Sequence, residues 1–237
     1  MQMTMRNQVC MITGATSGMG KATAAALAQM GATVILVARN RSKGETVRDE
    51  IRAQSGNINV EVLFADLSSQ QSIRELVDTF RQRYQQLHVL VNNAGGIFFK
   101  RETSVDGFEM TFALNHLGYF LLTDLLLDTL KASAPARIIN ISSSVERVGN
   151  INLNDLQSEK RYMSFGAYSQ SKLATMLFTY ELARRLAGTG VTVNAVTPGP
   201  VATNFGKTST GIVPAVFSFL FSFARSPEDG ARTAIYL

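Results

Sequence analysis

The sequence contains few of the side chains that form disulfides or bind transition metals. Among its 237 residues there is one cysteine, Cys10, and there are two histidines, His88 and His116. A single cysteine excludes an internal disulfide. Because Cys10 lies in an apolar run, we interpret it as a small core residue. A zinc site needs several histidine, cysteine or carboxylate ligands at short spacing, so we expect no metal site.

Long apolar runs and targeting features are also lacking. No run of apolar residues reaches the roughly 18 residues that a membrane-spanning helix needs, and the first residues lack the pattern of a signal peptide. The default expectation is a soluble, cytoplasmic protein. Charged residues make up 17% of the chain and hydrophobic residues 46%, which is typical of a globular protein. The net charge is +5, but the basic residues are scattered, so we expect no nucleic-acid partner.

Short apolar runs rich in β-branched residues alternate with longer helical patterns. This alternation predicts an α/β fold, a doubly wound parallel sheet of Rossmann type with helices on both faces, in three layers. No repeat or linker interrupts the pattern, so residues 1–237 are predicted to form a single domain. We expect strands at residues 9–13, 33–38, 59–64, 89–92, 137–142 and 191–196, and helices at residues 18–30, 43–55, 70–84, 105–131 and 165–186.

A glycine-rich turn, GATSGMG at residues 14–20, follows the first predicted strand and precedes an alanine-rich helix. Glycines let the backbone approach a diphosphate closely, and the helix start offers free N–H groups and a partial positive charge. The spacing differs from the common G-x-G-x-x-G fingerprint, but its place between a strand and a helix favours a dinucleotide site. No Gly-Lys-Ser/Thr ends the motif, which excludes a Walker loop.

Arg39 follows the second predicted strand, where an NAD site would carry an acidic residue for the ribose 2′-hydroxyl. An arginine can pair with a 2′-phosphate and stack on adenine, so NADP(H) is favoured over NAD(H). A solvent-exposed loop arginine is the alternative interpretation. After the third strand, Asp66 and Leu67 are candidates for contact with the adenine. Asp66 is equally a candidate for the N-cap of the next helix.

Tyr168 and Lys172 are four residues apart in a long helical pattern and therefore share one face. A free tyrosine titrates near about 10, and a nearby ammonium is expected to lower that pKa. Such a pair can exchange a proton with an alcohol or a carbonyl. The serine run at residues 142–144 offers a second donor to the same oxygen. Taken alone, the pair is better explained as a surface pair, and the other motifs decide against this.

Several motifs occur in the expected order and together resemble the short-chain dehydrogenase/reductase family over essentially the whole chain. They are TGATSGMG at 13–20, NNAG at 92–95, Asn115, the serine run at 142–144, YSQSK at 168–172 and PG at 198–199. DLQSEK at 155–160 and FTYELARRL at 178–186 are similar to the retinol-dehydrogenase-like branch of that family. The resemblance implies reversible hydride transfer between NADP(H) and an alcohol/carbonyl pair.

The resemblance also implies roles for the matched residues. Tyr168 is the implied general acid/base, and Lys172 lowers its pKa and holds the nicotinamide ribose. Ser143 is implied to bind the substrate oxygen, with Ser142 and Ser144 left open because the triple serine blurs the register. Asn115 is implied to hold a water that links Lys172 to solvent. The expected cofactor contacts are Gly14, Thr16, Ser17, Gly18, Met19, Gly20, Arg39, Asp66, Leu67, Asn92, Ala94, Gly95, Tyr168, Lys172, Pro198, Gly199, Val201 and Thr203.

Two features depart from the family pattern. The family usually carries an acidic residue where this chain has His88, at the end of the strand opposite the reactive end, so we favour a structural role over metal binding or catalysis. Relatives continue to one more strand beyond Leu237. Either the sequence is trimmed or the sheet lacks an edge strand, and an unpaired edge would invite covering by another chain.

Residues 205–225 fall where the family places its substrate lid, and they are rich in phenylalanine. The lid would close an apolar pocket on a lipophilic, retinoid-like aldehyde or ketone, rest on a membrane surface, or simply pack on the core. We expect Phe98, Phe205 and Phe217, with Ser143, to contact the substrate. A homodimer or homotetramer is also expected from the resemblance.

Two alternative functions were weighed against hydride transfer. A catalytically weak, cofactor-sensing regulator on the same fold should have lost Tyr168, Lys172 or Ser143, and all three are present. An epimerase or dehydratase of the extended branch would carry a C-terminal substrate domain and usually a different glycine spacing, and this chain has neither.

Overall fold

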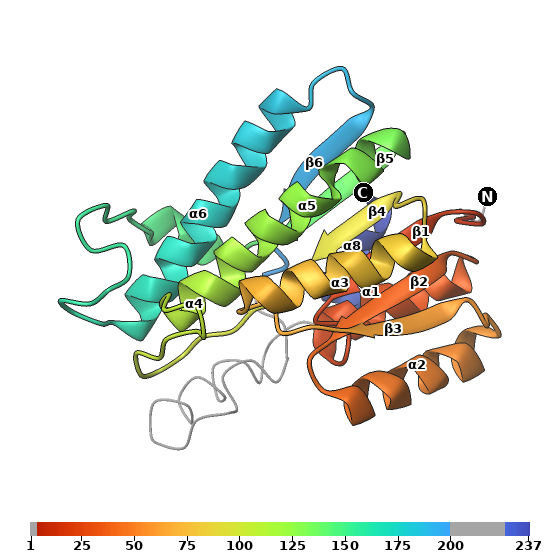
Figure 1. Cartoon of the computed structure of the whole chain (residues 1–237), viewed down its shortest axis with the longest axis horizontal. Helices are drawn as coiled ribbons and strands as arrows, with labels where there is room; N and C mark the ends of the chain where they lie inside the picture. Colours follow the sequence, from red (N-terminus) through yellow and green to blue (C-terminus); the bar gives the residue numbers. More distant parts are fainter. Residues whose placement is uncertain (1–3, 200–225) are drawn as a thin grey trace.

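The computed structural model describes residues 4–199 and 226–237. Its centre is one parallel sheet with the strand order β3-β2-β1-β4-β5-β6 (Figure 1). The order reverses between β1 and β4, which makes the sheet doubly wound and confirms the predicted fold class. The strands are β1 (Val9–Thr13), β2 (Thr33–Ala38), β3 (Val60–Phe64), β4 (Val89–Asn92), β5 (Ala136–Ile141) and β6 (Val191–Val196).

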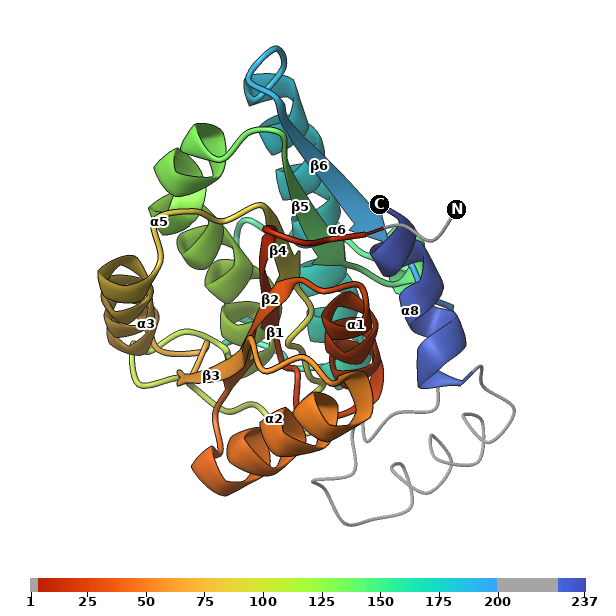
Figure 2. The ribbon, with the colours of Figure 1, turned by 90° about the vertical axis from the view of Figure 1, so that its right-hand side faces the viewer.

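Helices cover both faces of the sheet, with α3, α5 and α6 on one side and α1, α2 and α8 on the other (Figure 2). The helices are α1 (Gly18–Gln29), α2 (Arg41–Ser55), α3 (Gln70–Arg83), α4 (Met110–Phe112), the π-helix η1 (Ala113–Leu117), α5 (Gly118–Ala132), the 3-10 helix η2 (Ser144–Val148), α6 (Ser164–Arg185) and α8 (Pro227–Tyr236).

Alternate residues of each strand supply two separate cores. On β1, Met11 faces the core beneath α3, α5 and α6, whereas Cys10 and Ile12 face the core beneath α1, α2 and α8. Cys10 is fully buried, and burial raises the pKa of its thiol to about 12. The thiol therefore stays protonated, as expected for a core residue.

One predicted helix begins later than expected. The pattern predicted a helix over residues 105–131, but the helix begins at Met110. Asp106 and Gly107 form a turn instead, with Gly107 at a φ of 84°. The carboxylate of Glu109 then accepts hydrogen bonds from two backbone amides of the first helical turn and so fixes its start. The other predicted elements agree with the structure to within two residues at each end.

The stretch Met110–Ala132 is long and apolar enough to cross a membrane by length and composition alone. Half of it is buried inside the fold, and Leu122, Leu126 and Leu130 of α5 are fully buried in the core under the sheet. A core helix of this kind passes the same test, so the finding is weak evidence for a membrane span.

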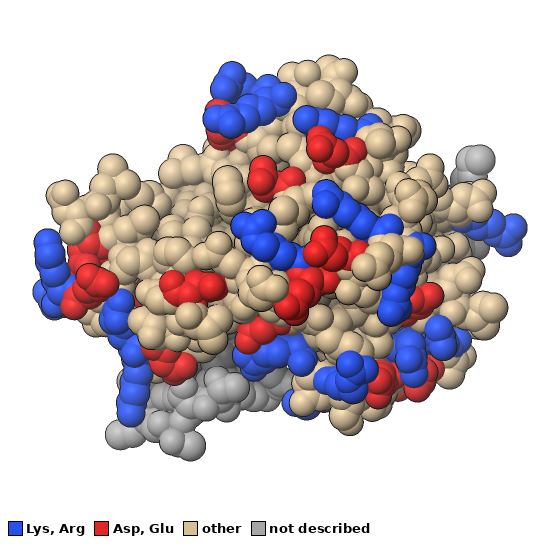
Figure 3. All heavy atoms as spheres, in the orientation of Figure 1, with Lys and Arg blue, Asp and Glu red and all other residues tan. Residues whose placement is uncertain are grey.

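Charges of both signs are interspersed on the face of the molecule drawn in Figure 3. Among the described residues, Arg48 pairs with Asp49 at 2.8 Å and Arg83 with Glu61 at 3.7 Å. This face therefore carries no stripe of one sign that would follow a nucleic-acid backbone.

His88 lies at the start of β4, at the edge of the sheet opposite the loops that follow the strands. Its Nδ1 accepts a hydrogen bond from the backbone N–H of Val9 over 3.0 Å, and the residue is only 7% exposed. Burial lowers the pKa of the imidazole. Accepting at Nδ1 requires a ring nitrogen without a proton, so this side-chain bond to Val9 forms only when the imidazole is neutral.

We expect the stability of the fold to fall as the pH drops below about 6.5, the ordinary pKa of histidine. Because the pKa of His88 is lower in the folded state, the unfolded chain binds more protons there, and the free energy of unfolding rises with pH. His88→Leu should lower the free energy of unfolding at pH 8 by about 1–3 kcal/mol, since the Val9 N–H loses its acceptor. Urea unfolding at pH 8 and pH 5.5 measures both effects.

The difference between the two proteins should narrow at pH 5.5, because His88 of the unfolded wild type becomes protonated below its ordinary pKa and the leucine variant has no such group. His116, whose pKa is lowered by burial to about 4, is present in both and cancels. A difference that is the same at both pH values would contradict a pH-dependent role for His88.

Candidate active site

The turn after β1 and the loop after β4 are tied together where the strand order reverses. Thr13 Oγ1 accepts hydrogen bonds from the backbone amides of Asn93 (2.8 Å) and Ala94 (3.0 Å). Gly14 has a φ of 63°, and a Cβ on it would lie 2.8 Å from the Cα of Ala94. Only glycine fits there, so the two loops form a single unit at the carboxyl edge of the sheet.

Asn93 supports this unit in a way that the sequence did not reveal. Its Nδ2 donates to the carbonyl oxygens of Thr13 (2.8 Å) and Gly14 (3.3 Å), and a Cβ on Gly20 would lie 2.5 Å from that nitrogen. Neither Thr13 nor Asn93 was among the predicted site residues. The available signal was their place in the two motifs, but only the folded structure shows the side-chain bonds.

The N-terminus of α1 faces the same edge with its backbone donors uncapped by a side chain. Ser17 occupies the N-cap position with extended backbone, yet makes no side-chain cap hydrogen bond to the described residues. The first turn contains no acidic residue. Met19 is buried, so it can offer only its backbone to a ligand. A free helix N-terminus beside a glycine turn fits the diphosphate of a dinucleotide.

The ends of β2 and β3 carry the next candidates. Arg39 is exposed directly after β2. Asp66 Oδ1 accepts hydrogen bonds from the backbone N–H (2.9 Å) and the hydroxyl (2.6 Å) of Ser68. The N-cap of α3 is Ser69, so the alternative prediction that Asp66 caps this helix is wrong. The carboxylate instead closes a local turn through its two bonds with Ser68.

Asn92, the last residue of β4, directs its side chain into the core. Its Nδ2 donates to Thr123 Oγ1 (3.0 Å) and Asn140 Oδ1 (2.8 Å), and the residue is fully buried. Asn140 in turn donates to Thr179 Oγ1 over 2.9 Å. Any contribution of Asn92 to a cofactor site is therefore limited to its backbone.

Asn115 connects the loop after β4 to helix α6. It lies in the π-helix η1, a helix type that is frequent at functional sites. Its side chain accepts from the N–H of Gly96 (2.8 Å) and donates to the carbonyl of Gly96 (2.9 Å) and to Ser171 Oγ (3.0 Å). A Cβ on Gly95 would lie 3.8 Å from Lys172 Nζ, so this loop passes directly beside the lysine.

Tyr168 and Lys172 project from α6 toward the end of β5. Lys172 is 3% exposed, and its Nζ donates to the carbonyl of Ile141 over 2.8 Å. Burial lowers the pKa of Lys172 to about 8. Burial also raises the pKa of Tyr168 to about 12, and a hydrogen bond with Ser143 opposes this rise.

Burial, and not the ammonium of Lys172, is the largest influence on the pKa of Tyr168 in the structure. Lys172 Nζ lies 5.8 Å from the centre of the tyrosine ring and directs its proton to Ile141 instead. Desolvation of the phenol then dominates.

The structure separates the three serines that the sequence left open. Ser143 is hydrogen-bonded to Tyr168. Ser142 is buried, and its hydroxyl is directed to the carbonyl of Lys172 at 3.4 Å. Ser144 is exposed at the start of η2. The geometry thus favours Ser143 as the partner of the tyrosine.

Glu146, on the 3-10 turn after Ser143, is a further charged group that the sequence analysis missed. Its carboxylate raises the pKa of both Tyr168 and Lys172. Its Oε2 is buried and has no hydrogen-bond partner among the described residues. An acidic residue three positions after a candidate catalytic serine was the only signal in the sequence.

Some of the remaining predicted site residues lie within the described part of the chain and others lie outside it. Phe98 lies close to Gly96, since a Cβ there would be 3.4 Å from its ring. Gly199, after β6, has a φ of 75° and follows Pro198. The lid at 205–225 and the residues Val201, Thr203, Phe205 and Phe217 lie outside the described residues.

This sheet, with a glycine turn and an open helix N-terminus at its switch point, defines a Rossmann-type dinucleotide-binding protein. The model of the short chain dehydrogenase family matches residues 8–211. The chain belongs to this family, to its retinol-dehydrogenase-like branch, and it is an oxidoreductase that acts on alcohol or carbonyl groups with a nicotinamide cofactor.

Two sets of comparisons support the assignment. Retinol dehydrogenase 12 of Mus musculus is 46% identical over 229 residues, which is 97% of this chain and 72% of the relative. Retinol dehydrogenase 13 of Homo sapiens is 44% identical over 241 residues, 99% of this chain and 72% of the relative.

Solved structures agree with the fold. An uncharacterised protein from Mycobacterium paratuberculosis superposes with a TM-score of 0.78 at 37% identity, covering 99% of this chain and 77% of that one. An alcohol dehydrogenase from Thermococcus sibiricus complexed with 5-hydroxy-NADP gives 0.75 at 26% identity, covering 97% and 89%.

We expect Glu146→Gln to move the high-pH limb of carbonyl reduction to lower pH. The carboxylate raises the pKa of Tyr168, so its neutralisation lets the phenol lose its proton earlier. The rate near pH 7 should change by less than about twofold, because the phenol remains protonated there. The pH profile of kcat/KM measures the shift. Arg147→Gln, an exposed neighbour on the same turn, is the control, and identical profiles for both variants would refute the role of Glu146.

Proposed function

We propose that the protein is an NADP(H)-dependent oxidoreductase that interconverts an alcohol and a carbonyl on a lipophilic, retinoid-like substrate. The observation that carries the proposal is the grouping of Ser143, Tyr168 and Lys172 beside the loop that Asn115 holds. The preference for the phosphorylated cofactor rests on Arg39, which is exposed at the end of β2 where an acidic residue would repel a 2′-phosphate.

The residues at the carboxyl edge fit such a cofactor. Gly14, Thr16, Ser17, Gly18 and Gly20 would receive the diphosphate at the start of α1. The adenosine side would meet Arg39, Asp66, Leu67, Ala94 and the backbone of Asn92, and the nicotinamide side would meet Gly95, Lys172, Pro198 and Gly199, with Val201 and Thr203 expected beyond them. When bound, the nicotinamide supplies or accepts the hydride.

The side chains divide the proton transfer among themselves. With a pKa of about 12, Tyr168 is protonated at neutral pH and donates its proton to a carbonyl oxygen. Ser143 donates a second hydrogen bond to that oxygen and orients the phenol. Lys172, held by Ile141, supplies positive charge beside the phenolate that remains. Asn115 keeps the loop of Gly95 against the lysine and is proposed to hold the water that returns a proton.

The lipophilic substrate is inferred from Phe98 and from the names of the relatives. Those relatives are named retinol dehydrogenases. Phe205 and Phe217 are proposed to close the pocket. We further propose a single-domain protein that forms a homodimer or homotetramer. Its location is proposed to be cytoplasmic, with peripheral membrane contact through residues 205–225.

The proposal is tested by mixing the purified protein with NADPH and a panel of aromatic and long-chain aldehydes, and following the loss of NADPH absorbance. We expect turnover, and Tyr168→Phe should lower kcat/KM by about 100-fold or more because the proton donor is removed. The variant should bind NADPH as the wild type does, which calorimetry checks. NADPH binding without turnover across the panel would contradict the enzyme assignment and favour a cofactor sensor.

Arg39→Asp should shift the cofactor preference toward NADH. The change removes a charged partner of the 2′-phosphate and adds a repulsive one, so the ratio of NADPH to NADH affinity should fall by about 10-fold or more. Affinities for both cofactors are measured by fluorescence titration. Lys43→Asp, an exposed change of the same charge in the first turn of α2, is the control. Unchanged relative affinities in Arg39→Asp would disprove the role of Arg39.

A further inference from the structure

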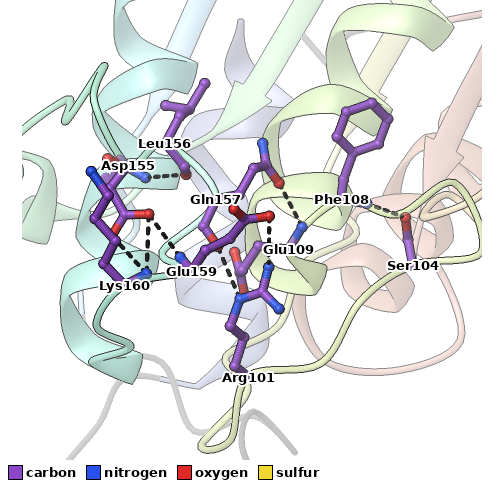
Figure 4. Close-up of polar contacts among 10 residues, drawn as sticks. Arg101, Ser104, Phe108, Glu109, Asp155, Leu156, Gln157, Glu159 and Lys160 are labelled. Carbon is purple, nitrogen blue, oxygen red and sulfur yellow. Dashed lines mark hydrogen bonds and ion pairs between the residues drawn. The ribbon is translucent and has the colours of Figure 1, made fainter.

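Two loops near the site are joined by polar contacts. These contacts involve none of the family motifs and none of the residues assigned to the reaction. One is the β4–α4 loop (residues 93–109) and the other is the η2–α6 loop (residues 149–163). Gln157 accepts from the N–H of Glu109 through Oε1 (2.7 Å) and from Arg101 Nε through its carbonyl (3.1 Å) (Figure 4). Arg101 also lies 3.8 Å from Glu159. The two loops therefore form one connected wall.

The η2–α6 loop is itself fixed to α6. Gln170, which is 5% exposed, donates to the carbonyl of Leu156 (3.0 Å) and accepts from the N–H of Asn152 (3.0 Å). Within the loop, Asp155 accepts from the N–H of Glu159 over 2.8 Å. Tyr168 also lies on α6. The η2–α6 loop is therefore held in place relative to Tyr168.

Tyr162 connects the end of the η2–α6 loop to the β4–α4 loop. Its hydroxyl donates to the carbonyl oxygen of Phe98 over 2.6 Å and lies 3.4 Å from Thr111 Oγ1. Burial raises the pKa of Tyr162 to about 12, so the hydroxyl remains a donor across the working range of pH. This single bond joins the end of the η2–α6 loop to the residue expected to contact the substrate.

Phe98 is held from its other side as well. Its ring lies against Gly96, whose N–H and carbonyl are both bonded to Asn115. The preceding residue, Gly95, borders Lys172. Contacts at Gly96 and at the carbonyl of Phe98 therefore hold the backbone of this residue, three positions after the Gly95 that borders Lys172.

We propose that Tyr162 is a specificity-determining positioning residue, which fixes Phe98 through its carbonyl oxygen and thereby shapes the substrate entrance beside Lys172. The inference rests on the proposed function, since it assigns Phe98 to the substrate side. The binding of a substrate long enough to reach Phe98 would depend on the hydrogen bond from Tyr162. The binding of a short substrate would not.

The first test compares propanal with cinnamaldehyde as substrates, with NADPH, in the wild type and in Tyr162→Phe, which removes only the hydroxyl. Loss of one positioning hydrogen bond should raise KM for cinnamaldehyde about fivefold while kcat and the KM for propanal stay within about twofold. In a Phe98→Ala background, Tyr162→Phe should have no further effect, because Tyr162 acts through Phe98. Arg161→Gln, the exposed neighbour, is the matched control.

Equal changes for the two aldehydes, no change for either, or effects that simply add in the double variant would overturn the inference. A second measurement does not depend on activity. Trypsin should cleave after Lys100, which is exposed two residues after Phe98, about threefold or more faster in Tyr162→Phe than in the wild type. An unchanged cleavage rate overturns the inference, whereas faster cleavage in a chain that reduces neither aldehyde would count against the proposed function alone.

Discussion

The structure depends on the burial of one ammonium group. Lys172 is almost fully enclosed, and a buried charge is costly unless it is hydrogen-bonded or paired. The carbonyl of Ile141 at the end of β5 meets this need directly, and the negative charge of Glu146 adds to it. Helix α6 can therefore lie only where its lysine reaches the end of that strand. This requirement sets the position of Tyr168 relative to Ser143, because one residue shares the helix and the other follows the strand.

Around this point, loops are held by side-chain bonds to the backbone rather than by regular secondary structure. Thr13 and Asn93 join the turn after β1 to the loop after β4, and Asn115 joins that loop to α6. The bonds of Thr13 and Asn93 satisfy backbone groups that a buried loop would otherwise leave unpaired. The cost of ordering these loops is met by burial of the cores beneath them.

The sequence predicted the fold well because both cores are encoded locally. Alternating residues such as Cys10, Met11 and Ile12 reveal a strand buried on both faces, and the turn at 14–20 marks where a ligand would approach. Prediction from the sequence failed where residues that are distant along the chain come into contact. Glu109 ends the loop before α4 by capping, Ser69 displaces Asp66 as a cap, and the roles of Asn93 and Glu146 exist only across loops. The choice among the three serines likewise required the structure, since spacing alone cannot tell which hydroxyl faces Tyr168.

The raised pKa of Tyr168 changes how the pair is understood. A tyrosine whose pKa had been lowered would serve mainly as a base, ready to remove a proton from an alcohol. Here the phenol is buried, Lys172 is turned toward Ile141, and Glu146 disfavours the phenolate further. The phenol of Tyr168 is therefore in its protonated form at neutral pH. Oxidation of an alcohol would require additional positive charge near the phenolate. A cationic nicotinamide ring is one such charge, so the same residues would favour opposite directions depending on the oxidation state of the ring beside them.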